Sequence, residues 1–420
     1  MADQLANLSL LAGGSDLVEA AKYYEDIPGY ADKAVMLYHK AGMIGRALDL
    51  AFKTDQFSAL DLIAKELDES SDPRVLERAA EFFANNQQYK KAVQLLAFAK
   101  NFDSAIELCR RTNVPVTEEL AEAISPTKEA IPSSSERNKL LERIAECCLQ
   151  QSNYHYAAKK FAQAGNKIQA MRALIKSGDT PKIILFANTA RNKDIYRIAG
   201  NYLQTINWKE DTNIMKHIEN FYSRAGAYDS LAGFFESCAE VELEEYHDYE
   251  KTAIALAESV RHLNRALEKD HDKYLVEKRD EIESRIQMIQ DFLSIREIYE
   301  NDPGEAMRRL TALTEDPKAD KFLRLGDVYA VIIIHNAKRA NYKKAHQMIE
   351  QFQQKLPRVD INEYVVPDVL DKICDEVKAP RVTNGRYQRD DIDEAEGAVE
   401  YSHALRKQME AKSFYEALDE

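Results

Sequence analysis

The sequence predicts an all-α solenoid, a stack of helical hairpins, that is followed by an acidic C-terminal tail. Three observations predict this fold class. A motif of an aromatic residue, two variable residues, Ala and Gly occurs three times along the chain. No stretch shows sustained alternation of apolar and polar residues, so we expect no strands. The 420 residues include only 14 Gly and 11 Pro, which suits long helices with short joints.

The repeated motif predicts how the helices pack. Its three copies are Tyr38, Ala41 and Gly42; Phe161, Ala164 and Gly165; and Tyr222, Ala225 and Gly226. An aromatic residue and an Ala three positions later lie on one helical face, where the Ala lets a neighbouring helix approach. The Gly is expected to end the helix in the left-handed conformation. The first two copies also have an Ala four residues before the aromatic, which completes the Ala-x3-Phe-x2-Ala core of the tetratricopeptide pattern. The motif therefore predicts tetratricopeptide-like helical hairpins, and the alternative is an ordinary helical bundle with chance matches.

We expect a first solenoid segment over residues 1–111. Its predicted helices cover residues 16–27, 31–40, 46–53, 57–67, 73–85, 89–100 and 102–111. Residues 112–135 break this rhythm with three prolines and a run of three serines. They are predicted to form a linker or projecting loop, with one short helix over residues 117–124.

A second solenoid segment is expected over residues 136–379. Long apolar stripes at spacing three and four predict a longer helical hairpin near residues 244–299, with a charged turn near residues 269–272. Short helix pairs resume at Pro303, Lys318 and Tyr342. Asp or Ser followed by Pro predicts helix starts at residues 72, 125, 302 and 316.

The tail covers residues 380–420, and from residue 381 it carries ten acidic and six basic residues. Five small or apolar residues fall on one side of a predicted helix, namely Ala395, Ala398, Ser402, Leu405 and Met409. One interpretation is a frayed acidic terminus. The other is a docking helix that becomes ordered when Leu405 and Met409 enter a groove on a partner subunit.

Composition narrows the classes of partner. The net charge of −14 argues against binding nucleic acid or an anionic membrane through the whole-molecule field, although a local basic face stays possible. Pairs of basic residues at 90–91, 159–160, 308–309 and 343–344 are interpreted as a solvated face, with a nucleic-acid site as the alternative. The five cysteines, an odd number without paired spacing, indicate buried thiols in a reducing compartment. The start lacks the basic region of a signal peptide, and the apolar run 328–334 is too short to span a bilayer.

No motif with chemistry is visible, so we assign no catalytic, metal or cofactor-binding residue. The sequence has no CxxC or HExxH metal pattern and no glycine-rich phosphate loop. Cys147 and Cys148 are neighbours on a predicted helix and point about 100° apart, so they do not converge on one ion. An enzyme with an unrecognised helical active site remains the alternative from another functional class.

Several ordered segments carry a resemblance to a known family. They are residues 32–42, 62–64, 71–73, 162–167, 170–180, 231–235 and 326–329. Over about residues 3–375 the chain resembles the C-terminal helical repeats of the intraflagellar transport 140 family, whose members are subunits of the intraflagellar transport A complex. The tail after residue 380 does not take part in the resemblance.

The resemblance implies a function and a location. The family's fuller chain has tandem β-propellers before such a solenoid, so this chain is expected to be a C-terminal fragment, and whether Met1 is native is left open. The resemblance implies a non-enzymatic scaffold of the cilium or flagellum, active in retrograde transport, cilium assembly and delivery of membrane cargo. It implies the other intraflagellar transport A subunits as partners, with cargo or its adaptors reached indirectly. The alternative is a coat or tethering α-solenoid of secretory-pathway vesicle traffic.

Overall fold

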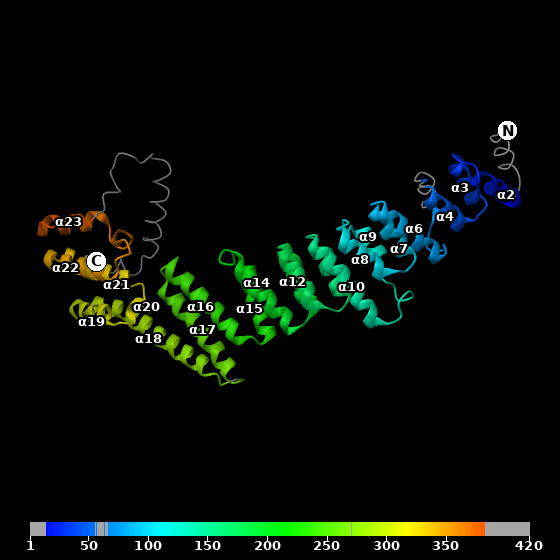
Figure 1. Ribbon diagram of the computed structural model, residues 1–420. Helices are drawn as coiled ribbons and strands as arrows, with labels where there is room; N and C mark the ends of the chain where they lie inside the picture. Colours follow the sequence, from blue (N-terminus) through cyan, green and yellow to red (C-terminus); the bar gives the residue numbers. More distant parts are fainter. Residues whose placement is uncertain (1–13, 55, 57–62, 64–65, 270, 383–420) are drawn as a thin grey trace. The chain divides into compact units, whose positions relative to one another are not determined.

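The computed structural model describes residues 14–54, 56, 63, 66–269 and 271–382. Its elements are helices throughout, with no strand in these residues, so the predicted all-α solenoid is confirmed (Figure 1). The chain forms two compact units, residues 1–199 and 200–420. None of the helices in the described residues is both long and apolar enough to cross a bilayer.

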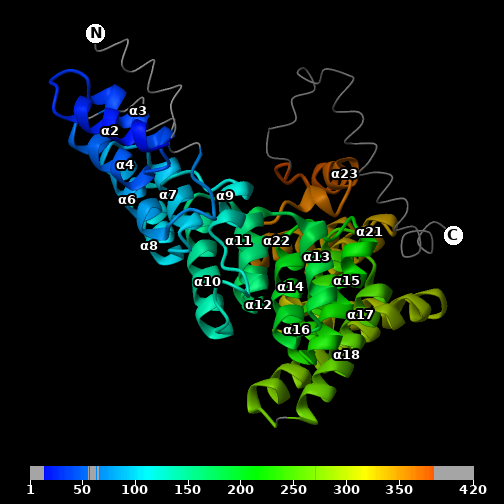
Figure 2. The same ribbon diagram turned by 90° about the vertical axis from the view of Figure 1, so that its right-hand side faces the viewer.

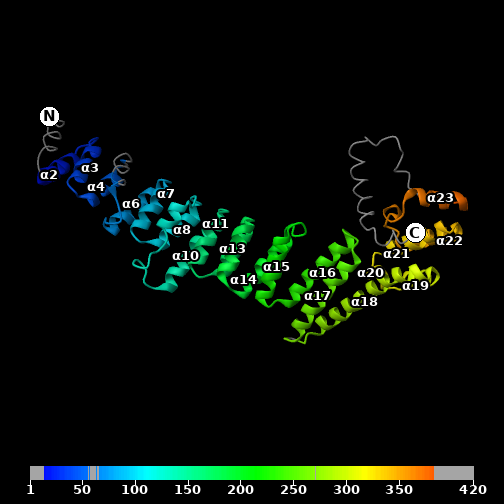
Figure 3. The ribbon, with the colours of Figure 1, turned by 180° about the vertical axis from the view of Figure 1, so that it is seen from behind.

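In the first unit most helices pack against the next one along the chain (Figure 3), but the short helix Glu118–Ala123 packs against Tyr89–Phe98 instead. Its helices are α2 (Gly14–Glu25), α3 (Ala31–Lys40), α4 (Ile44–Lys53), α6 (Pro73–Asn85), α7 (Tyr89–Phe98), α8 (Phe102–Thr112), α9 (Glu118–Ala123), α10 (Ser134–Gln150), α11 (Tyr154–Gln163), α12 (Lys167–Ser177) and α13 (Thr180–Ala190). One apolar cluster runs through this part from Leu17 on α2 to Leu95 on α7. Helix α14 (Lys193–Thr205) spans the division between the units.

The second unit contains the longest helices. Its elements are α15 (Thr212–Ala225), α16 (Tyr228–Glu244), α17 (Tyr249–Leu267), α18 (Lys273–Asn301), α19 (Pro303–Glu315), α20 (Ala319–Phe322), α21 (Leu325–Lys338), α22 (Tyr342–Lys355), the 3₁₀ turn η1 (Ile361–Glu363) and α23 (Pro367–Val377). Helices α17 and α18 form a long hairpin whose tip is visible in Figure 2. Residues Val328 to Ile333 of α21 are each at most 2% exposed, so α21 is the central buried helix of this unit.

Two of the four predicted Pro-marked helix starts are correct. Asp72 and Asp302 each accept hydrogen bonds from backbone N–H groups of the first turn, and a proline follows at the first helical position. No helix begins at residue 125; it follows the end of α9, and the Ser125 hydroxyl donates to the Ala121 carbonyl oxygen at 2.5 Å. Helix α20 begins three residues after Asp316, with Lys318 at the cap. The pattern of Asp or Ser followed by Pro therefore occurs in turns as well as at helix starts.

Residues 114–125 of the predicted linker or projecting loop form hydrogen bonds to Gln151, Asn153 and Lys160, whereas most of residues 127–135 are exposed. Gln151 anchors the backbone of this segment, since its side-chain amide donates to the Val114 carbonyl oxygen at 2.6 Å and its oxygen accepts from the Val116 N–H at 2.8 Å. Val116 is 1% exposed. The prolines signal the end of regular helix pairing, but they carry no information on whether the apolar residues between them are buried.

Lys160 is the second anchor of this segment. It is 1% exposed, and its ammonium donates to Glu122 Oε2 at 2.8 Å and to Ser125 Oγ at 2.7 Å. Hydrogen bonds from Lys159 and then Lys160 lower the pKa of the Glu122 carboxyl. The interpretation of the pair 159–160 as a solvated face is therefore wrong for Lys160, because a buried ammonium needs the partners that Glu122 and Ser125 supply.

Candidate interaction grooves

The three copies of the sequence motif end their helices with the same turn. The glycines adopt positive φ angles of 75° at Gly42, 84° at Gly165 and 69° at Gly226. In each copy the N–H of the residue after Gly donates to the carbonyl oxygen of the aromatic residue, at 2.9 Å for Met43 and Tyr38, 2.9 Å for Asn166 and Phe161, and 3.1 Å for Ala227 and Tyr222. This is the Schellman turn. In it the N–H groups of the left-handed residue and of the next residue donate hydrogen bonds to carbonyl oxygens in the last turn of the helix.

The motif alanines lie nearer the surface than the aromatic rings. Ala164 is 7% and Ala225 is 8% exposed, whereas Ala34 and Ala157, four residues before the aromatic, are 0% exposed. In the third copy the small residue lies on the preceding helix. A Cβ added to Gly200 would be 2.8 Å from the nearest atom of the Tyr222 ring. The small residues that allow close helix packing are therefore the Ala four residues before the aromatic and, in the third copy, Gly200 on the neighbouring helix.

The two tyrosines of the motif bind the preceding helix through their hydroxyl groups. Tyr38 donates to Glu25 Oε2 at 2.6 Å, and Tyr222 donates to Asn201 Oδ1 at 2.8 Å. Burial, reinforced by Glu25, raises the pKa of Tyr38 to about 12, and burial also raises the pKa of Tyr222 to about 12. Both phenols therefore remain protonated donors near neutral pH.

A second repeat, of 65 residues, lies within the first unit. Asn101 caps α8 and donates to Glu77 Oε1 at 2.8 Å; Asn166 caps α12 and donates to Glu142 Oε1 at 2.8 Å. The separation is 24 residues in both pairs. Helices α6–α7–α8 and α10–α11–α12 are therefore two copies of one structural unit. The first copy does not match the sequence motif, because Leu96 stands where the second copy has Phe161 and Lys100, with φ 57°, stands where it has Gly165.

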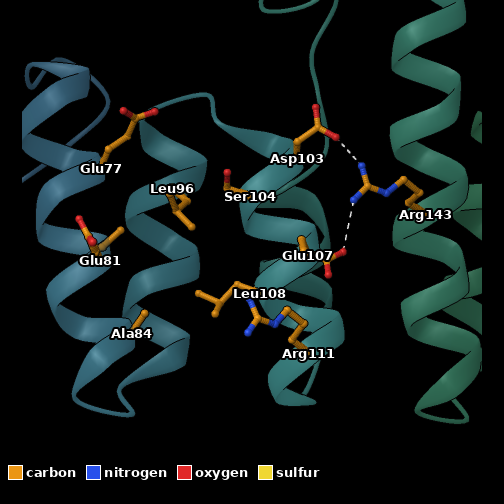
Figure 4. Close-up of a pocket in the computed structure, with 11 residues that line it drawn as sticks. Glu77, Glu81, Ala84, Leu96, Asp103, Ser104, Glu107, Leu108, Arg111 and Arg143 are labelled. Carbon is orange, nitrogen blue, oxygen red and sulfur yellow. Dashed lines mark hydrogen bonds and ion pairs between the residues drawn. The ribbon is translucent and has the colours of Figure 1, made fainter.

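The first groove is lined by residues of α6, α7, α8 and α10 and has a volume of about 470 Å³ (Figure 4). Apolar side chains of Ala80, Ala84, Leu96 and Leu108 contribute to its lining. Its charged residues are Glu77 and Glu81 on α6, Asp103, Glu107 and Arg111 on α8, and Arg143 on α10. The groove thus combines apolar lining with charges of both signs.

The carboxylates on α8 are largely compensated. Arg143 forms an ion pair with Asp103 and lies 3.8 Å from Glu107 (Figure 4). Arg110 donates two hydrogen bonds to Glu107, which lower the pKa of that carboxyl. Glu81 and Arg111 form no ion pair with any residue that the structure describes. These two side chains are available to a polypeptide lying in the first groove.

The second groove occupies the equivalent place in the next repeat and has a volume of about 410 Å³. It is lined by Glu142, Ala164, Gly165, Asn166, Lys167, Ile168 and Asn192. Glu142 and Ile168 are the 65-residue counterparts of Glu77 and Asp103 in the first groove. Ile168 thus replaces an aspartate, with Lys167 beside it, so the second groove has one carboxylate, Glu142, where the first has four.

Across the residues that the structure describes, no three His, Cys, Asp or Glu side chains are placed to hold a metal ion. Cys147 and Cys148 are buried on α10, and Cys109 of α8 is buried as well. Burial, followed by the neighbouring thiols, raises the pKa of Cys109 to about 12. Buried, protonated thiols of this kind are packing residues. Leu405 and Met409 lie outside the described residues.

Comparison with known proteins identifies the family. The tetratricopeptide-repeat domain of intraflagellar transport proteins 140 and 172 matches residues 1–221, which is more than half of the chain. The chain belongs to this family. A second family, the C-terminal tetratricopeptide-repeat domain of intraflagellar transport protein 140, matches residues 229–353. The resemblance recognised from the ordered sequence segments is therefore confirmed, and both grooves lie within the first of the two matches.

A solved structure also matches this family member along its length. It is a "Circular tandem repeat protein with novel repeat topology and enhanced subunit contact surfaces", with 14% sequence identity. The match covers 98% of this chain and 97% of that protein, at a TM-score of 0.15. Such a low TM-score carries no argument about the arrangement of the repeats.

Proposed function

We propose that the chain is a non-enzymatic scaffold of the intraflagellar transport A complex. In this role it supports retrograde transport, cilium assembly and ciliary delivery of membrane proteins through protein–protein contacts. The proposal rests on one observation, the two consecutive family matches that both name intraflagellar transport protein 140. Its partners are the other subunits of that complex, and it acts on the cytoplasmic side of the cilium or flagellum.

The surface of the first unit suits a scaffold. Helical repeats bind partners through extended surfaces that successive repeats build together. The first and second grooves, of about 470 and 410 Å³, are such surfaces at equivalent places of neighbouring repeats. Each can accept a polypeptide segment that places an apolar side chain in the groove and polar groups at the charged residues.

The test is affinity purification of the tagged chain from ciliated cells, with quantitative mass spectrometry. We expect enrichment of intraflagellar transport A subunits, unchanged by a chelator or by removal of nucleotide, because packed surface rather than a bound ion would hold the partners. Enrichment of secretory-coat subunits in their place would contradict the proposal. Loss of the transport subunits on adding the chelator would contradict association through preformed surface alone.

A further inference from the structure

Positive charge is concentrated in one part of this acidic protein. Residues 167–199 contain seven Lys or Arg and two Asp, a net charge of +5, whereas the whole chain has a net charge of −14. All seven cationic residues are exposed. We call these seven residues the α12–α14 basic surface, and the helices that carry or adjoin them are labelled in Figure 2; they are Lys167, Arg172, Lys176, Lys182, Arg191, Lys193 and Arg197.

Most of these cations lack a counter-ion in the protein. Lys182 pairs with Asp179 at 3.0 Å, and the Lys167 ammonium donates to the Ala190 carbonyl oxygen at 3.1 Å. The other five form no ion pair within 4.0 Å with the residues that the structure describes. In contrast, Lys159 is held by Glu118 and Glu122. A solvated helix face in so acidic a chain would be expected to show similar pairs.

The second groove lies at one edge of this surface. Lys167 and Ile168 line it, and Asn192, between two of the cations, lines it as well. Ile168 is 38% exposed, so its side chain is available for an apolar contact. The one carboxylate in the groove belongs to Glu142. One of its oxygens already accepts a hydrogen bond from the Asn166 side chain at 2.8 Å. The groove thus presents an apolar contact beside unpaired cations.

We propose that the α12–α14 basic surface binds an acidic polypeptide segment that places an apolar side chain against Ile168 in the second groove. Charge complementarity identifies this partner, because carboxylates would supply the counter-ions that the five unpaired cations lack. The proposal concerns the first unit alone and does not depend on which complex the chain joins.

Two other anionic partners fit less well. A bilayer would find few apolar side chains to insert, since Leu185 and Ile168 are the large ones exposed among residues 167–199. Single-stranded nucleic acid is bound through exposed aromatic rings between the cations. Here Tyr196 is buried and Phe186 is half-buried.

The test uses the full chain and a fluorescein-labelled peptide of three Glu-Glu-Asp-Leu repeats, with binding measured by fluorescence anisotropy at 50 mM salt. The charge reversals R172E/K176E on α12 and K193E/R197E on α14 should each weaken binding at least tenfold. The matched control is K343E/K344E on α22, which reverses two exposed cations of the second unit. It should change binding less than twofold. A peptide with Gly in place of each Leu should bind at least threefold more weakly, because it loses the contact with Ile168.

Several results would overturn the inference. Absence of peptide binding at 50 mM salt would do so, as would equal weakening by the α22 control, which would reveal only a net-charge effect. Equal binding of the Leu and Gly peptides would exclude the second groove. If vesicles containing phosphatidylserine, or oligo-dT, bound in a manner abolished by R172E/K176E while the peptide did not, the partner would be a membrane or nucleic acid. Circular dichroism of each variant checks that the helices are retained.

Discussion

The contact between Gly326 and Tyr364 offers a quantitative test of packing in the second unit. Gly326 is buried in the first turn of α21, and a Cβ added there would lie 2.4 Å from Cε1 and 2.5 Å from Cζ of the Tyr364 ring. These separations are far below van der Waals contact, so Gly326→Ala forces the ring to move. The ring is confined, because the Arg324 guanidinium lies 5.0 Å from its centroid and the Phe352 ring centroid lies 6.0 Å away.

Two opposing terms set the size of the effect. Replacing Gly by Ala in a helix contributes about 1 kcal/mol of stability. Overpacking in a confined site costs about 1–3 kcal/mol, and a clash this severe belongs at the upper end. We therefore expect Gly326→Ala to lower the local unfolding free energy of α21 by about 2 kcal/mol. Hydrogen exchange of α21 peptides in the full chain, measured by mass spectrometry, reports this local free energy.

Gly233 provides the matched control. It lies inside α16 of the same unit, and a Cβ added there meets nothing within 4 Å. Gly233→Ala should therefore stabilise α16 by about 1 kcal/mol. Tyr364→Leu removes the two closest ring atoms, so in that background Gly326→Ala should cost less than about 0.5 kcal/mol. If Gly326→Ala leaves the exchange of α21 unchanged or slows it, the packing argument is wrong.

Three further predictions concern the motif, a thiol and the tail. Ala164→Trp should cost about 1–3 kcal/mol in urea melts because Ala164 is buried at a helix end, whereas Lys167→Trp at an exposed position should cost under about 0.5 kcal/mol; equal costs would show that the motif is not a packing device. Burial raises the pKa of Cys109 from 9.0 to about 12, so its thiol should resist alkylation at pH 8 in the folded chain. Its contribution to the free energy of unfolding should be complete below pH 9 and be lost as the pH rises toward 12. Rapid alkylation without unfolding would contradict this. Leu405→Asp with Met409→Asp should weaken association with the transport complex but leave the melting temperature unchanged, and undiminished assembly would leave the tail as a solvated end.

The sequence predicts the all-α class well because helical packing leaves a strong periodic signal. The long stripe through Leu256 and Leu263 lies on α17, and both residues are 0% exposed. The predicted segment boundaries at 111 and 136 rest on proline content and stay a prediction. Burial of Val116 and Lys160 depends on contacts with residues about 35 positions away, for which local composition carries no signal.

The candidate grooves and the basic surface were not predicted, for two different reasons. The α12–α14 basic surface is visible in the sequence as an excess of cations over a window of 33 residues. Its members are spaced along helices, so they do not form the adjacent basic pairs that mark residues 90–91 or 159–160. Whether such cations are paired depends on the fold, since Lys159 and Lys182 have partners while Arg172 and Lys176 have none in the described residues.

The grooves depend on a repeat that the glycine motif conceals. In the described residues the turn that closes the three motif helices also occurs five times without glycine, at Gln87, Lys100, Ser152, Ala340 and Lys378, each with φ between 57° and 60°. Left-handed backbone costs a non-glycine residue about 1–2 kcal/mol, which packing of the flanking helices can offset. Glycine is therefore not necessary for this turn, and a pattern that requires glycine includes only some of the repeats. A search keyed to a helix-capping Asn and a Glu 24 residues earlier would have found the pair of equivalent grooves, because that hydrogen bond joins the first and third helices of each repeat.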